Sequence, residues 1–184
     1  EKALKAWKEN HFENEVVPID MYGESTIEQD EGPREPDLEK IKSLDPAFLK
    51  GGTITAATSS PVSIGAAAVL ITSRDFAEKN GLKIRANIKG RSVAGVDWRR
   101  MGMGPLPATQ KILSKTGLSM DEIDVIELNE AFAAQSLYVI QKGNWDISKV
   151  NHNGGAIALG HPLGCSGARI LTTLVNVLEQ QDSK

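Results

Sequence analysis

One glycine-rich segment, residues 150–169, constrains the fold of this 184-residue chain more than any other stretch. It contains five glycines, and His161 lies between Gly160 and Pro162 on a largely apolar background. Glycine allows close backbone approach and positive φ angles that other residues adopt poorly. Apolar residues then recur at the 3.6-residue spacing of a helix, at Ile170, Leu171, Leu174, Val175 and Leu178. We therefore expect His161 on a tight turn directly before a helix, where a short, fixed backbone would hold a site residue.

Strand-like and helix-like segments alternate from residue 51 to the end. Apolar runs predict strands at 53–55, 65–72, 84–94 and 123–128. Helical spacing and capping residues predict helices at 73–81, 106–116, 130–142 and 170–178. The run at 65–72 is typical of a strand buried on both faces. The alternation predicts an α/β layered domain.

Residues 1–50 are less regular than the rest. Apolar spacing predicts a short helix at 1–10, and Pro18 favours an edge position for an extended stretch at 15–21. An acidic, proline-broken loop follows at 22–36, and helical turns are expected at 37–44. We interpret this part as an appendage or loop region.

Charge and cysteine content exclude several function classes. The net charge of −3 without a basic block disfavours nucleic acid and membrane surfaces as partners. No apolar run approaches the roughly 18 residues of a membrane span, and no signal peptide opens the chain. Cys165 is the single cysteine, which excludes an intrachain disulfide and fits a reducing compartment such as the cytoplasm. Because the chain starts without methionine and ends in a polar tail, we interpret it as a fragment.

Three stretches are candidates for chemistry, and each has a purely structural alternative. His161 is the first, although a lone histidine on an apolar background is more often a core residue. Asn129 follows a predicted strand, where α/β sheets place ligands, but it also suits a helix N-cap. The hydroxyl-rich turn at 57–60 suits a polar ligand or a self-satisfied ST-turn.

In combination, these motifs resemble the thiolase family of the degradative or acetyl-CoA acetyltransferase type. Asn-Glu-Ala-Phe at 129–132 is followed by the glycine-rich block 153–162, which ends in Gly-His-Pro. Blocks at 30–34, 52–56 and 101–105 extend the resemblance over nearly the whole chain.

The resemblance implies a thiolase-like layered α/β fold, a mixed sheet covered by helices, of which this chain would be the C-terminal half. Residues 1–50 would form part of the coenzyme-A-binding loop region, and 51–82 the last strand and helix of the N-terminal half. Residues 83–184 would form the truncated C-terminal domain.

The resemblance also implies acyl transfer through an acylated cysteine, in thiolysis of 3-ketoacyl-CoA or Claisen condensation of acetyl-CoA. His161, supported by Gly160 and Pro162, would activate that cysteine, because a thiol near pH 7 is mostly protonated. Asn129 would serve an oxyanion hole through an ordered water. Coenzyme A would meet Ser60, Ala131, Phe132 and, at its adenine end, Arg34.

In the family, both catalytic cysteines would lie outside residues 1–184, so Cys165 is expected to be a bystander and the fragment alone inactive. Coenzyme A would be a substrate, with no cofactor and no metal. The full-length protein would be a homodimer or homotetramer. Two alternatives are a related ketoacyl synthase, expected to carry histidine at Asn129, and a non-catalytic coenzyme-A-binding or structural module.

Overall fold

The computed structural model describes residues 1–181, and helices dominate it. The α-helices are α1 (Lys2–Lys8), α2 (Leu38–Lys42), α3 (Arg74–Lys79), α4 (Pro105–Thr116), α5 (Ala133–Gly143), α6 (Ala156–Leu159) and α7 (Ser166–Gln180). Short 3-10 helices are η1 (Ala56–Thr58), η2 (Trp98–Met103), η3 (Met120–Glu122) and η4 (Ile147–Lys149). Strands β1 (Ile19–Asp20) and β2 (Thr26–Ile27) form an antiparallel hairpin.

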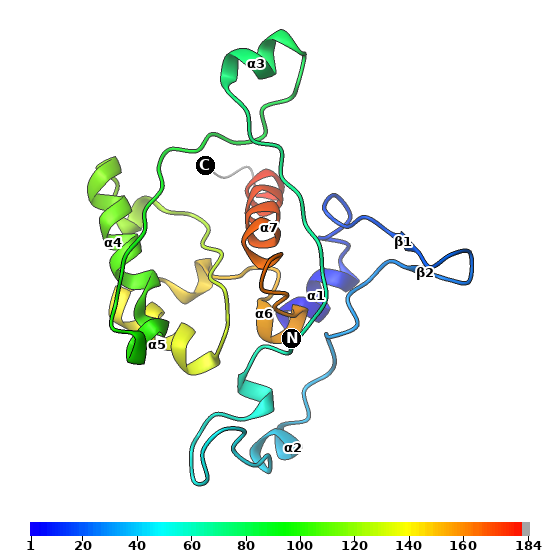
Figure 1. Cartoon of the computed structure of the whole chain (residues 1–184), viewed down its shortest axis with the longest axis vertical. Helices are drawn as coiled ribbons and strands as arrows, with labels where there is room; N and C mark the ends of the chain where they lie inside the picture. The colour runs from blue at the N-terminus through cyan, green and yellow to red at the C-terminus, as the bar shows by residue number, and fades with distance from the viewer. Residues whose placement is uncertain (182–184) are drawn as a thin grey trace.

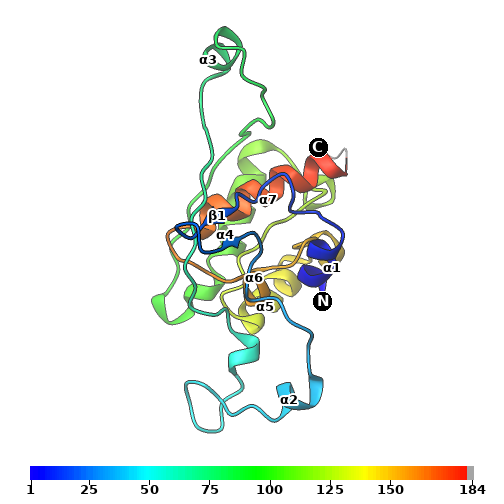
Figure 2. The same cartoon turned by 90° about the vertical axis from the view of Figure 1, so that its right-hand side faces the viewer.

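Helix α7 runs through the middle of the molecule (Figure 1). Helices α4 and α5 lie to one side of it, and α1 and the β1–β2 hairpin lie to the other. Helices α2 and α3 stand at opposite ends of the long axis, each reached by extended chain (Figures 1 and 2). The short helix α6 leads into α7, so the glycine-rich segment occupies the centre.

A small apolar core holds the segments that carry the two main motifs. It consists of the buried residues Leu128, Val139, Ile140 and Val150, with Ile126 and Trp145 packed against them. Ile126 and Val150 form an isolated parallel bridge. The Ile126 amide donates to Lys149 O, and the Asn151 amide donates to Ile126 O, each at 2.8 Å. The end of the predicted strand at 123–128 therefore lies beside the start of the glycine-rich segment.

Local signals place most helix ends as predicted. Ser73 caps α3 by accepting the Phe76 amide at 3.2 Å. Helix α4 begins at Pro105 and ends before Gly117, whose φ of 71° suits glycine. Helix α5 begins three residues later than predicted, because Phe132 is still extended and pairs with Ser59.

The predicted strand at 65–72 is not a buried strand in this structure. Among residues 1–181, no backbone hydrogen bond reaches this segment, and Leu70 is 78% exposed. The predicted strands at 53–55 and 84–94 likewise join no ladder in the described part of the chain. Strand pairing needs a neighbouring strand, and none runs beside these segments here. Within the described residues, no helix is long and apolar enough to cross a membrane.

Candidate active site

The side chains of Asn129 and His161 contact each other. Asn129 Nδ2 lies 3.3 Å from His161 Nε2. On the opposite side of the ring, His161 Nδ1 lies 2.6 Å from Ser166 Oγ. Both His161 and Asn129 are half-buried. The alternative of Asn129 as an ordinary N-cap is wrong, because α5 starts four residues later and its cap position is Phe132.

Asn151 clamps the chain just before Asn129 to the glycine-rich segment. Its Oδ1 accepts the Leu128 amide at 2.8 Å, and its Nδ2 donates to Leu128 O at 2.9 Å. The Asn151 side chain thus makes the two backbone hydrogen bonds to Leu128 that a neighbouring strand would otherwise make. Because Asn151 is 3% exposed, water does not compete for these hydrogen bonds.

Glu130 makes a second link between the two motifs, one that the sequence did not reveal. Its carboxylate accepts Asn151 Nδ2 at 3.0 Å and the Ile157 amide at 3.2 Å. Ile157 lies in the first turn of α6, so Glu130 ties this helix to the residue beside Asn129. A Cβ on Gly155 would overlap the Glu130 carboxylate, which explains glycine at that position.

The predicted tight turn at His161 is confirmed. Helix α6 ends at Leu159, and its C-cap Gly160 has a φ of 98° and a ψ of 162°, which are unfavourable for a residue with a Cβ. Pro162 O then accepts the amides of Cys165 and Ser166 at 2.9 Å each, and α7 begins at Ser166. His161 is therefore held between two helices on a backbone with little freedom.

The hydroxyl-rich turn reaches the same region. Thr58 and Ser59 both donate to Thr55 O, so these two hydroxyls satisfy the local ST-turn alternative. Ser60 differs, because its amide and its Oγ donate to Ala131 O at 3.0 and 3.2 Å. Its oxygen lone pairs remain available to accept hydrogen bonds.

Phe132 and Arg34 complete the predicted set. The Phe132 ring meets Phe48 edge-on, with ring centroids 5.9 Å apart. Arg34 is exposed on the loop between β2 and α2. Two residues earlier, Gly32 lies so close to Ala158 O that a Cβ would be 2.5 Å away. This loop therefore packs on α6, but no contact joins Arg34 to His161.

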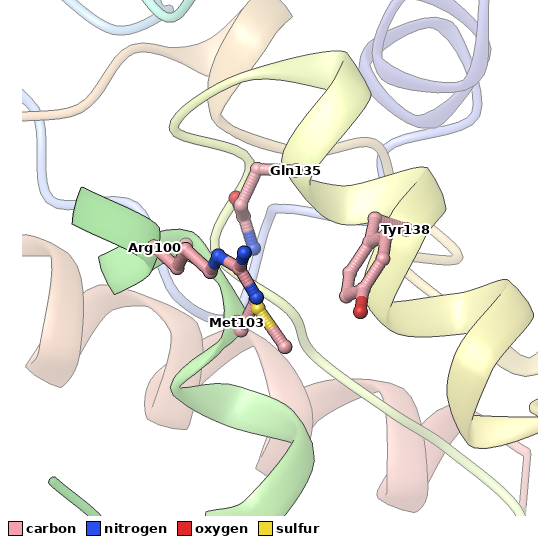
Figure 3. A pocket seen from close by; sticks show the side chains of 5 residues that line it. Arg100, Met103, Gln135 and Tyr138 are labelled. Carbon is pink, nitrogen blue, oxygen red and sulfur yellow. The ribbon is translucent and has the colours of Figure 1, made fainter. Parts of the chain in front are cut away.

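Hollows in the described surface lie beside the histidine turn and between η2 and α5. One of about 550 Å³ borders the histidine turn and is lined by residues 63–67 and 162–165. The other, of about 340 Å³, lies between η2 and α5 and is lined by Arg100, Gly102, Met103, Gln135 and Tyr138 (Figure 3). Arg100 and Met103 come from η2, whereas Gln135 and Tyr138 come from α5, with Tyr138 set apart from the other three side chains. It shares no lining residue with the histidine turn.

Buried carboxyl groups lie behind the site. Burial raises the pKa of Glu127 to about 8, and the Arg169 guanidinium, 3.8 Å away, offsets only part of that effect. Burial also raises the pKa of Glu15 to about 7, against a hydrogen bond from Thr173. In the part of the chain that is described, no group of three or more His, Cys, Asp or Glu residues is placed to hold a metal ion.

Family models match nearly the whole chain. The model of the thiolase C-terminal domain matches residues 82–184, and that of the thiolase N-terminal domain matches residues 1–75. A 3-ketoacyl-CoA thiolase of Vibrio vulnificus is 51% identical over 192 residues, which cover 100% of this chain and 50% of that protein. The chain thus spans about half the length of the curated relatives that it matches.

Solved structures agree with these matches. The acetyl-CoA acetyltransferase of Bacillus anthracis superposes with a TM-score of 0.94 at 41% identity, over 100% of this chain and 48% of that one. The dimeric peroxisomal thiolase of Saccharomyces cerevisiae gives 0.93 at 46% identity, over 96% of this chain and 46% of that one. The predicted layered α/β fold is confirmed by these superpositions.

Proposed function

The chain belongs to the thiolase family, and from this premise we propose that it supplies a base and an oxyanion donor to a CoA-dependent acyltransferase. The reaction would be thiolysis of a 3-ketoacyl-CoA, or its reverse, Claisen condensation of acetyl-CoA. The observation that carries the proposal is the contact between Asn129 and His161, which unites two motifs far apart in the sequence.

His161 is the proposed base. It would take the proton of a cysteine thiol, and the resulting thiolate would attack the thioester carbon and form the acyl-enzyme. The tight turn and the neighbouring helices hold the ring in place, which favours proton transfer over a fixed short distance.

Asn129 is the proposed partner in stabilising charge on the thioester oxygen. Its Oδ1 is buried and has no protein partner among the described residues, so it is left to accept a hydrogen bond, for which we propose a water as the donor. Such a water, held by Asn129, would donate towards the oxygen as negative charge develops. A decarboxylating ketoacyl synthase would be expected to carry histidine at this position, so asparagine favours the thiolase reaction.

Coenzyme A is the proposed substrate partner. We assign its pantetheine arm to Ser60, Ala131 and Phe132, which lie side by side through the Ser59–Phe132 bridge. We assign Arg34 to the adenine end, on the loop that packs against α6. Gly160 and Pro162 support the turn without touching substrate.

The nucleophile would come from outside residues 1–184. Cys165 is buried at the cap position of α7 and packs towards residue 65 rather than forming a pair with His161. By itself, the 184-residue chain should therefore bind CoA without catalysing acyl transfer. The proposed divisions of the chain remain 1–50, 51–82 and 83–184. The full-length protein is proposed to be a homodimer or homotetramer in the cytoplasm.

A thiolysis assay tests this function. The protein at its full natural length should cleave acetoacetyl-CoA in the presence of CoA and carry a trapped acetyl group on a cysteine other than Cys165. The 184-residue chain alone should show no turnover. Calorimetric binding of CoA without turnover or acylation in the full-length protein would instead support a non-catalytic CoA-binding module.

A further inference from the structure

Ser166, the first residue of α7, contacts the ring nitrogen of His161 that faces away from Asn129. Its Oγ lies 2.6 Å from His161 Nδ1 and 3.1 Å from Pro162 O. Ser166 is 4% exposed, so water has little access to these contacts. The same hydroxyl thus touches the proposed base and the backbone of the turn that carries it.

The partners of Ser166 Oγ favour one position for the ring proton of His161. Pro162 O is a carbonyl and only accepts, so its 3.1 Å contact with Ser166 Oγ is a hydrogen bond only if the single hydroxyl proton of Ser166 points to it. Ser166 Oγ then accepts from His161, which places a proton on Nδ1. A neutral imidazole carries one ring proton, and Nε2 is therefore left as an acceptor. The donor that faces Nε2 is the Asn129 amide nitrogen, which agrees with this assignment.

The acceptor at the end of this chain is itself fixed. Pro162 O also accepts the amides of Cys165 and Ser166 at 2.9 Å. These bonds hold the carbonyl at the N-terminal end of α7, so the Ser166 hydroxyl has one strongly favoured direction. Hydrogen bonds thus run in one sense from Asn129 through His161 and Ser166 to Pro162 O.

We propose that Ser166 is a positioning residue, which holds His161 in the Nδ1–H tautomer and so reserves Nε2 as the base. This role rests on the proposed acyltransferase function. Ser166 touches neither substrate nor the reacting atoms. It acts through a neutral hydroxyl, so it sets the orientation and tautomer of the ring without adding charge beside it.

The tautomer is measured directly by ¹⁵N NMR of histidine-labelled protein at a pH where the ring is neutral. The His161 signals are identified by their loss in His161→Gln. We expect Nδ1 to resonate as a protonated nitrogen and Nε2 as an unprotonated one. Protonated Nε2 in the unmodified protein would overturn the proposal without any question of variant folding.

Kinetics of three variants of the full-length protein then separate positioning from general packing. Loss of one neutral hydrogen bond corresponds to roughly a tenfold effect. Ser166→Ala should therefore lower kcat about tenfold, leave KM for CoA unchanged and populate the Nε2–H tautomer. Ser166→Thr should retain both rate and tautomer, since Thr116 and Thr172 make the same hydroxyl-to-carbonyl bond one helical turn back.

Thr172→Ala is the matched control, because it removes such a bond from α7 without a histidine partner. It should leave kcat and the His161 signals unchanged. Ser166→Ala with the original tautomer and rate would refute the role of Ser166. If the unmodified protein has the predicted tautomer but no acyltransferase activity, the proposed function fails while the ring assignment stands.

Discussion

Asn129 Nδ2 lies 3.3 Å from His161 Nε2, although 32 residues separate them in the sequence. The contact does not depend on these two side chains alone. Asn151 bonds the Leu128 backbone on one side of Asn129, and on the other side the Glu130 carboxylate bonds Asn151 and the Ile157 amide. Two short motifs are thus built as one unit, and changes in either should affect the site in predictable ways.

Replacing the base should affect chemistry far more than binding. In the full-length protein, His161→Ala should slow acyl-enzyme formation by roughly 10²–10⁴-fold, the usual range for a lost general base. The Kd for CoA should change less, because His161 holds no assigned part of CoA. Burst kinetics and calorimetry measure the two quantities. Equal losses in both would mark His161 as structural.

A methyl group at residue 155 should damage the link between the motifs. Gly155→Ala would drive its Cβ into the Glu130 carboxylate, which cannot move without losing Asn151 and the Ile157 amide. We expect a loss of about 1–3 kcal/mol in the free energy of unfolding.

Gly167→Ala is the control for that measurement, since a Cβ at this helical position meets nothing within 4 Å. Alanine should be neutral or stabilise α7 by about 0.5–1 kcal/mol. Urea unfolding measures the free energy of unfolding of both variants. Equal changes in the two variants would rule out the clash at Glu130.

Stability should fall as pH rises through the neutral range. Burial raises the folded-state pKa of Glu127 from its ordinary value of 4.5 to about 8. The folded state therefore holds this proton more tightly than the unfolded chain. The stabilisation is complete below about pH 4.5 and is lost as pH rises towards 8, at up to about 1.4 kcal/mol per pH unit for such a carboxyl.

Glu127→Gln removes this titration and should flatten the decline in unfolding free energy between pH 5 and 8. Glu15, whose pKa is raised to about 7, would account for part of the remaining slope. Glu28→Gln replaces a carboxyl on the exposed surface and serves as the control for the substitution itself. An unaltered slope in Glu127→Gln would mean that Glu127 is ionised in the folded protein.

Cys165→Ala should leave turnover nearly intact in the full-length protein. The thiol is buried beside the turn and fills space, so we expect a stability loss of about 1 kcal/mol rather than a catalytic one. Steady-state kcat and thermal unfolding test this directly. A collapse of kcat in a folded variant would give Cys165 a part in the chemistry.

Features that depend on near neighbours could be predicted from the sequence. The turn at His161, the Ser73 cap and the end of α4 before Gly117 each follow from residues within one or two turns. The resemblance to a family added the pairing of Asn129 with His161, which spacing alone could not supply. Local reasoning even favoured the wrong alternative for Asn129, the helix cap.

Features that depend on distant partners were missed. Nothing in the local sequence shows that Asn151 bonds to Leu128, or that Glu130 reaches the Ile157 amide. Residues 65–72 show the opposite error, a buried strand that was predicted but is not present. An apolar run indicates burial only where another segment covers it. In the described chain none does, and Leu70 and Ile71 are exposed.

Helix α3 stands apart from the other helices at the end of two long extended legs (Figures 1 and 2). It spans six residues, and helices this short do not persist in water without tertiary support. Its returning leg is tied to α7 through Arg85 and Glu179. In the chain as it stands, the amide protons of α3 should therefore exchange with solvent well before those of α5 and α7. Hydrogen-exchange mass spectrometry would then resolve a separate opening unit at 73–81 while α5 and α7 remain protected.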